Sequence, residues 1–214
     1  MHVRVKDGIY SVGAVDWNLR DFHDYETLRG SSYNVYLVQD EKTALIDTVK
    51  APFTGELLRN LSELTSPADI DYVVVNHAEP DHSGGLPEVM ATCPQATVVC
   101  DQKCVGTLST YYDTAGWNFH IVATGDTLSL GARSLTFVEI PMVHWPESMV
   151  TYIPEDKLLF SNDAFGQHYA ASARFDDEVP LDVLMAEAKT YYANIVMPYG
   201  KQVVKTLEKA AELD

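Results

Sequence analysis

A dense group of metal-binding side chains follows an apolar run in the middle of the chain. Four of six consecutive positions carry side chains that can bind a metal: His77, Glu79, Asp81 and His82. They come directly after Tyr72-Val73-Val74-Val75, which has the composition of a buried strand. Pro80 disfavours helical geometry at Glu79, and alternate side chains of an extended backbone project to one side. We therefore expect His77 and Glu79 to face the same way, before a turn at Ser83-Gly84-Gly85 whose small residues let the backbone approach a bound group closely.

Two further candidate ligands lie much later in the chain. His144 and Asp163 each follow a strand-like apolar segment, Leu135 to Ile140 and Lys157 to Phe160 respectively. Together with the first group they provide three histidines, two aspartates and one glutamate, enough ligands for two metal ions. A nitrogen and oxygen set without thiolate suits iron or manganese, or zinc where the geometry permits.

The order and spacing of these motifs resemble those of the flavodiiron proteins, or A-type flavoproteins, which are built on the metallo-β-lactamase fold. The resemblance covers essentially the whole chain, and the segments that carry it are Phe22 to Thr27, Gly30 to Leu37, His77 to His82, Pro141 to Met149 and Ser161 to Gly166. A hydrolase of this fold has His-x-His-x-Asp-His, so Glu79 is the discriminating residue. It replaces an imidazole by an anionic oxygen, which favours iron over zinc.

The resemblance implies a role for each candidate residue. His77, Glu79 and His144 would hold one iron, Asp81 and His82 the other, and Asp163 would bridge both. Apart from the resemblance, Trp145 is expected to form a wall of the pocket because it directly follows His144. His23 resembles a non-ligand histidine beside the iron centre, as a proton donor or as a hydrogen-bond partner for bound oxygen. His168 either lies near the centre or is an ordinary loop residue.

The sequence departs from the family pattern at its end. The family has another histidine ligand a little beyond the position of Asp214, followed by a flavodoxin-like domain that binds FMN, and neither can be matched here. The chain is expected to be a fragment of a longer protein, or else a natural stand-alone form. We expect the second iron site to be weakly occupied, or completed by water or a neighbouring chain.

The implied activity is reduction of O2 to water, of NO to N2O, or of both. In the family FMN relays electrons from a rubredoxin-type donor across a head-to-tail homodimer, so the isolated chain is expected to turn over poorly. Two other functions stay open: a flavodoxin-free diiron sensor that binds oxygen, and a metal-dependent hydrolase. Reversible oxygen binding would mark the first, and activity of the zinc-loaded protein on esters, thioesters or lactams the second.

Composition narrows the class of protein further. The chain has 15 Lys plus Arg against 31 Asp plus Glu, a net charge of −16, which disfavours nucleic acid and anionic membranes as partners. No linker-like or repetitive segment interrupts it, so residues 1–214 are expected to form one domain. The N-terminus lacks the apolar core of a signal peptide, which predicts a cytoplasmic protein. An odd number of cysteines, Cys93, Cys100 and Cys104, predicts free thiols.

Apolar periodicity predicts an α/β protein. The expected strands are Ile9 to Val15, Tyr33 to Gln39, Ala44 to Asp47, Asp71 to Asn76, Ala96 to Cys100, Asn118 to Ala123, Ser134 to Ile140, and a hairpin of Met149 to Ile153 with Lys157 to Phe160. The expected helices are Phe53 to Leu64, Asp101 to Tyr112, Leu181 to Val196 and Lys201 to Leu213. This pattern fits a metallo-β-lactamase-like αββα sandwich, with the ligands on loops at one edge of the sheets.

Overall fold

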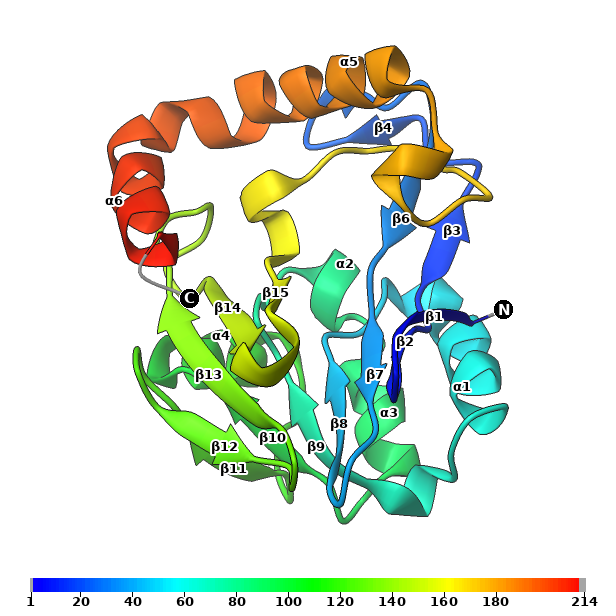
Figure 1. Ribbon diagram of the computed structural model, residues 1–214, viewed down its shortest axis with the longest axis vertical. Coiled ribbons are helices and arrows are strands. Elements are labelled where there is room, and N and C mark those ends of the chain that lie inside the picture. The colour runs from blue at the N-terminus through cyan, green and yellow to red at the C-terminus, as the bar shows by residue number, and fades with distance from the viewer. Residues whose placement is uncertain (1, 212–214) are drawn as a thin grey trace.

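Two β-sheets pack face to face with helices outside them in the computed structural model, which describes residues 2–211 (Figure 1). Within these residues the larger sheet has seven strands in the order β1-β2-β7-β8-β9-β10-β11, and the smaller has four in the order β12-β13-β14-β15. Strands β8 to β11 run parallel, and the other neighbours are antiparallel. The predicted αββα sandwich is therefore confirmed.

The strands are short and fall into these two sheets and two separate pairs. The larger sheet contains Val3–Lys6 (β1), Ile9–Ser11 (β2), Tyr36–Val38 (β7), Thr43–Ile46 (β8), Ile70–Val74 (β9), Thr97–Cys100 (β10) and Asn118–Ile121 (β11). The smaller sheet contains Thr127–Ser129 (β12), Ser134–Glu139 (β13), Met149–Ile153 (β14) and Leu158–Phe160 (β15). The separate pairs are Ala14–Asp16 (β3) with Ser31–Tyr33 (β6), and Asp21–Phe22 (β4) with Tyr25–Glu26 (β5).

The central strands of the larger sheet are buried on both faces, which explains their continuous apolar runs. In β8, Leu45 packs in the layer beneath the helices, while Ala44 and Ile46 pack against the smaller sheet. The same alternation places Val73 of β9 with the helices and Val74 between the sheets. The sequence therefore specifies two layers of core on either side of one sheet.

Helices cover the outer faces and one end of the sandwich. They are Thr54–Ser62 (α1), Pro80–Ser83 (α2), Leu86–Thr92 (α3), Gln102–Tyr111 (α4), Leu181–Tyr191 (α5) and Gly200–Ala210 (α6), with a π-helical turn Tyr192–Val196 and a 3-10 turn Met197–Tyr199 between the last two. Other 3-10 turns are Ala51–Phe53, Pro67–Asp69, Pro154–Asp156, Asn162–Phe165 and Asp176–Glu178. Figure 1 shows α5 crossing one end of the molecule near β4, and α6 beside the smaller sheet. There Val203 of α6 packs against the apolar cluster formed by Val138, Ile140, Val143 and Val150.

The structure corrects several predicted boundaries. The predicted strands Ile9 to Val15 and Tyr33 to Gln39 are each divided, because the chain leaves the larger sheet to form the β3–β6 pair. Gly13 lies where the two segments approach, and a Cβ there would be only 1.9 Å from the carbonyl oxygen of Tyr33. The predicted helix Leu181 to Val196 continues from α5 into the π-helical turn. Leu213, the predicted end of the last helix, is outside the described residues.

Some elements were not predicted at all. They are β1, β12, the β4–β5 hairpin, and helices α2 and α3. The three cysteines are buried and unpaired, as predicted. Among residues 2–211, no helix has the length and apolar character needed to cross a membrane.

Candidate metal centre

The loop after β9 supplies most of the candidate ligands. Glu79 has an extended backbone, with φ −58° and ψ 142°, and Pro80 then begins the short helix α2. The extended conformation places His77 and Glu79 on one side, as predicted, because His77 Nε2 lies 3.1 Å from Glu79 Oε2. Asp81 and His82 lie on the helical turn. The hydroxyl of Ser83 donates to the carbonyl oxygen of Ala78 at 2.7 Å and closes the loop upon itself.

The smaller sheet supplies the two distant ligands. His144 lies in the loop after β13, and Asp163 in the 3-10 turn after β15. These loops and the loop after β9 meet at one edge of the sandwich, as predicted from the position of each residue beyond a strand. Four residues, His77, Glu79, His144 and Asp163, each offer one ligand atom, and these atoms all lie within 4.8 Å of one another.

Asp163 faces two groups of side chains. Its Oδ2 lies 3.3 Å from His144 Nε2 and 3.5 Å from His77 Nε2. Its Oδ1 lies 2.9 Å from His82 Nε2, which is in turn 3.6 Å from Asp81 Oδ2. Each oxygen of one carboxylate therefore faces a separate set of potential ligands, which is the arrangement a bridging carboxylate requires.

Burial and charge are tightly coupled in this cluster. Burial alone would raise the pKa of Glu79, but the imidazoles of His144 and His77 hold it at about 2. Burial alone would lower the pKa of His77, but contacts with Glu147 and Glu79 raise it to about 9. The anionic carboxylates therefore stabilise protonated histidines in the metal-free cluster. A metal cation that replaces those protons would be attracted by the same carboxylates.

Two unsatisfied atoms test whether a metal fits. His144 Nε2 and Asp81 Oδ1 are buried and make no hydrogen bond within the described residues. His144 Nε2 is 3.2 Å from Glu79 Oε2, but at an angle that does not form a hydrogen bond. A buried polar atom without a partner costs about 1–3 kcal/mol, and coordination to a metal would satisfy both atoms. The nitrogen and oxygen donors match iron, manganese or zinc.

Glu147 is a buried member of the site that the sequence did not single out. Its Oε1 accepts hydrogen bonds from the backbone N–H of Ala78 at 3.2 Å and contacts His77 Nδ1 at 3.0 Å. A carboxylate that is hydrogen-bonded to the ring nitrogen facing away from the metal fixes the tautomer and ring orientation of a ligating histidine. The only signal for it was its place in the Pro141 to Met149 motif, three residues after His144.

His23 and Trp145 both lie beside the cluster. His23 is at the tip of the β4–β5 hairpin with a left-handed backbone, φ 53°, and its Nε2 is 3.1 Å from Glu79 Oε1. The Trp145 ring packs edge-on against His77, with 5.3 Å between ring centroids. Both residues therefore lie beside the cluster, as the sequence predicted, and their roles stay predictions.

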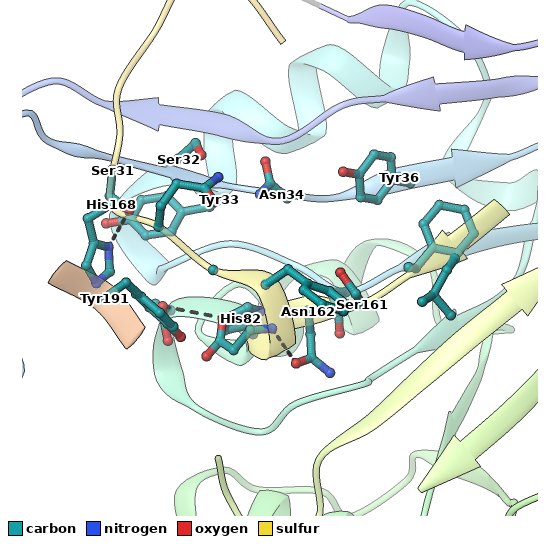
Figure 2. A pocket seen from close by; sticks show the side chains of 18 residues that line it. Ser31, Ser32, Tyr33, Asn34, Tyr36, His82, Ser161, Asn162, His168 and Tyr191 are labelled. Atoms are coloured by element: carbon teal, nitrogen blue, oxygen red, sulfur yellow. Dashed lines mark hydrogen bonds and ion pairs between the residues drawn. The ribbon is translucent and has the colours of Figure 1, made fainter. Parts of the chain in front are cut away.

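A cavity of about 220 Å³ opens next to Asp81, His82 and Asp163. Figure 2 shows Tyr191 and His168 near His82 at one end of this cavity. His168, which the sequence left undecided, therefore lies near the centre. Tyr191 is buried and lines the same cavity as Asp163, whereas its neighbour Tyr192 is exposed.

The two facing sheets define a metallo-β-lactamase-like domain, and the histidine and carboxylate loops at their edge form a cluster that could hold metal ions. The family model described as ODP family beta lactamase matches residues 31–214, and the chain belongs to this family. A nitric oxide reductase from Moorella thermoacetica is 51% identical over 99% of this chain and 54% of its own length. The anaerobic nitric oxide reductase flavorubredoxin of Salmonella arizonae is 48% identical over 95% of this chain and 43% of its own length.

Solved structures give the same result. The flavodiiron protein from Giardia intestinalis has a TM-score of 0.98 and 43% identity, covering 100% of this chain and 52% of its own. The rubredoxin oxygen:oxidoreductase of Desulfovibrio gigas has a TM-score of 0.94 and 44% identity, covering 99% and 53%. The chain thus spans about half the length of the flavodiiron relatives that it matches.

Proposed function

We propose that this chain is the diiron module of an O2 or NO reductase. The observation that carries the proposal is Asp163, whose two oxygens face the His77/His144 pair and His82 separately. The names of the relatives support both gases, since one is a nitric oxide reductase and another an oxygen oxidoreductase. Residues 1–214 form one domain in this proposal, because the two sheets share a core.

Six residues would hold the metals. His77, Glu79 and His144 would bind one iron, Asp81 and His82 the other, and Asp163 both. When bound, two adjacent irons supply electrons together, so that a gas molecule is reduced without release of a one-electron product. The second iron has fewer ligands from the described residues, which predicts weaker binding there.

The remaining residues of the site orient these ligands. His23 contacts the Glu79 oxygen that does not face His77, and so fixes the rotation of the carboxylate. Glu147 fixes the ring of His77 from its outer nitrogen. The ring of Tyr191 helps to enclose the cavity beside Asp163. Low exposure of the ligands keeps bulk water away, which strengthens each of these polar contacts.

Electrons have to come from outside the chain. We propose that FMN on a further domain, reduced by a rubredoxin-type donor, supplies them across a head-to-tail homodimer. The isolated chain loaded with iron should therefore show little gas consumption with such a donor alone. Sustained donor-driven consumption without any added flavoprotein would contradict this part of the proposal.

The activity itself is tested by supplying the electrons chemically. The chain is loaded anaerobically with ferrous iron and given chemically reduced FMN, and loss of NO or O2 and formation of N2O are measured. We expect consumption that is abolished in Asp163→Asn and retained in Asp113→Asn, a change in an exposed turn. Absence of gas consumption with both irons bound, or hydrolysis of a lactam or thioester by the zinc-loaded protein, would overturn the proposal.

A further inference from the structure

Three buried polar atoms outside the ligand set lack a hydrogen-bond partner within residues 2–211. They are Tyr25 Oη, Thr27 Oγ1 and His168 Nε2. The rings of Tyr25 and His168 are in contact, with centroids 5.8 Å apart. Tyr25 Oη and His168 Nε2 each need a partner, and a small polar molecule between the two contacting rings would supply it.

His168 is held in one orientation. Its Nδ1 is 2.9 Å from the hydroxyl of Ser31. Its ring packs against the rings of Phe22 and Tyr191, with centroid distances of 5.1 Å and 5.4 Å. Burial lowers the pKa of His168 to about 4, so the imidazole is neutral near pH 7. A neutral imidazole that is hydrogen-bonded at Nδ1 presents either one donor or one acceptor at Nε2. The contacts of the ring with its neighbours fix the direction in which Nε2 points.

The reaction of the proposed function requires protons inside the molecule. Reduction of two NO to N2O and water consumes two protons with two electrons, and reduction of O2 to two water molecules consumes four of each. His168 and Tyr191 both line the cavity beside Asp163. Figure 2 shows Ser31, His168 and Tyr191 following one another along this side of the cavity toward His82.

We propose that His168 is a positioning residue that holds, together with the Tyr25 hydroxyl, one water molecule on the proton path to gas bound beside Asp163. This inference rests on the proposed function for its catalytic part alone. The water accepts from or donates to His168 Nε2 and bonds Tyr25 Oη, which satisfies both atoms. Proton transfer through it leaves no net change on the imidazole.

The structural part is tested without turnover. A high-resolution crystal structure of the chain should contain a water within hydrogen-bond distance of both His168 Nε2 and Tyr25 Oη. His168→Phe keeps an aromatic ring packed against Phe22 and Tyr191 but removes Nε2, so it should remove that water. Tyr25→Phe should remove it as well. An empty space between the two atoms in the unmodified chain would overturn the inference.

The catalytic part uses the iron-loaded chain with reduced FMN. We expect His168→Phe to lower kcat by about tenfold or more with unchanged KM and iron content, and to increase the solvent deuterium isotope effect. His168→Gln, whose amide can hold the water, should recover part of the loss. The matched control His120→Phe changes a histidine on the edge strand β11 and should leave kcat unchanged.

The two proposals fail in different ways. A kcat within about twofold of the unmodified chain in both His168→Phe and Tyr25→Phe would refute the proton path while leaving the reductase function intact. Absence of gas reduction in the unmodified chain would refute the proposed function, and the crystallographic water would still decide whether His168 and Tyr25 hold a small polar molecule.

Discussion

Replacing Glu147 by glutamine isolates the contribution of the buried carboxylate behind His77. Glutamine has nearly the same shape, but lacks the charge that receives the His77 and Ala78 hydrogen bonds. A hydrogen bond to a charged group is worth about 1 kcal/mol more than a neutral one. Only the bond to His77 responds to the metal, because the Ala78 bond is the same with and without it. This converts to a loss of about fivefold in metal affinity, which is somewhat less than the loss of about 10–100-fold typical of such partners.

The size of this loss should depend on pH. In the metal-free chain His77 is protonated up to a pKa of about 9, so a metal has to displace a proton near neutral pH. Glu147→Gln also lowers the proton affinity of His77, so that a metal displaces this proton more easily. This offsets part of the loss of metal affinity at about pH 7. We therefore expect the full effect at about pH 9.5 and a smaller one at about pH 7.

Chelator competition with zinc as a redox-silent probe measures both values. Glu155→Gln is the matched control, because Glu155 also accepts from one backbone N–H and one side chain, both of Ser134, on an exposed surface. It should bind zinc as the unmodified chain does. An affinity of Glu147→Gln within about threefold of the unmodified chain at about pH 9.5 would refute the reasoning.

Three other predictions concern stability and metal content. The metal-free chain should have its highest Tm near pH 6.5 when thermal unfolding is measured across pH. The raised pKa of His77 gives stability that is lost as pH rises from 6.5 to about 9. The lowered pKa of His168 gives stability that is lost as pH falls from 6.5 to about 4. A Tm that rises steadily from pH 6.5 to 9 would contradict this assignment. Gly166→Ala should destabilise the chain by about 1–3 kcal/mol in urea unfolding, because its Cβ would lie 2.7 Å from Cζ of the buried Tyr191 ring; an unchanged midpoint would show that the ring moves freely. Asp163→Asn should reduce bound iron from two ions to at most one in metal analysis, and retention of both would exclude a bridging role.

The sequence predicted those parts of the fold whose signal is local. The run before Asn76 was predicted as a strand because both faces of β9 are buried and need apolar residues. Helix α3 was missed because Gly84, Gly85 and Pro87 are typical of turns, although proline is well tolerated in the first turn of a helix. The β4–β5 hairpin was missed because its strands have two residues each and are held by tertiary contacts.

In the candidate site, too, the sequence predicted the features that have a local signal and missed those that depend on tertiary packing. The clustering of the candidate ligands was predictable, because several chemically matched residues follow strands whose ends meet at one edge; that they bind metal stays a prediction. Glu147 was not, because one carboxylate near a ligand has no distinguishing spacing. Tyr191 and Tyr192 are adjacent in the sequence, and only the packing of α5 against the site decides that Tyr191 faces inward.

Anomalous X-ray scattering at the iron edge, from crystals of the chain loaded with ferrous iron, tests the central claim most directly. The account predicts two iron peaks on either side of Asp163, one against His77, Glu79 and His144 and the other against Asp81 and His82. A single peak that does not contact Asp163, or no peak within this cluster, would contradict it.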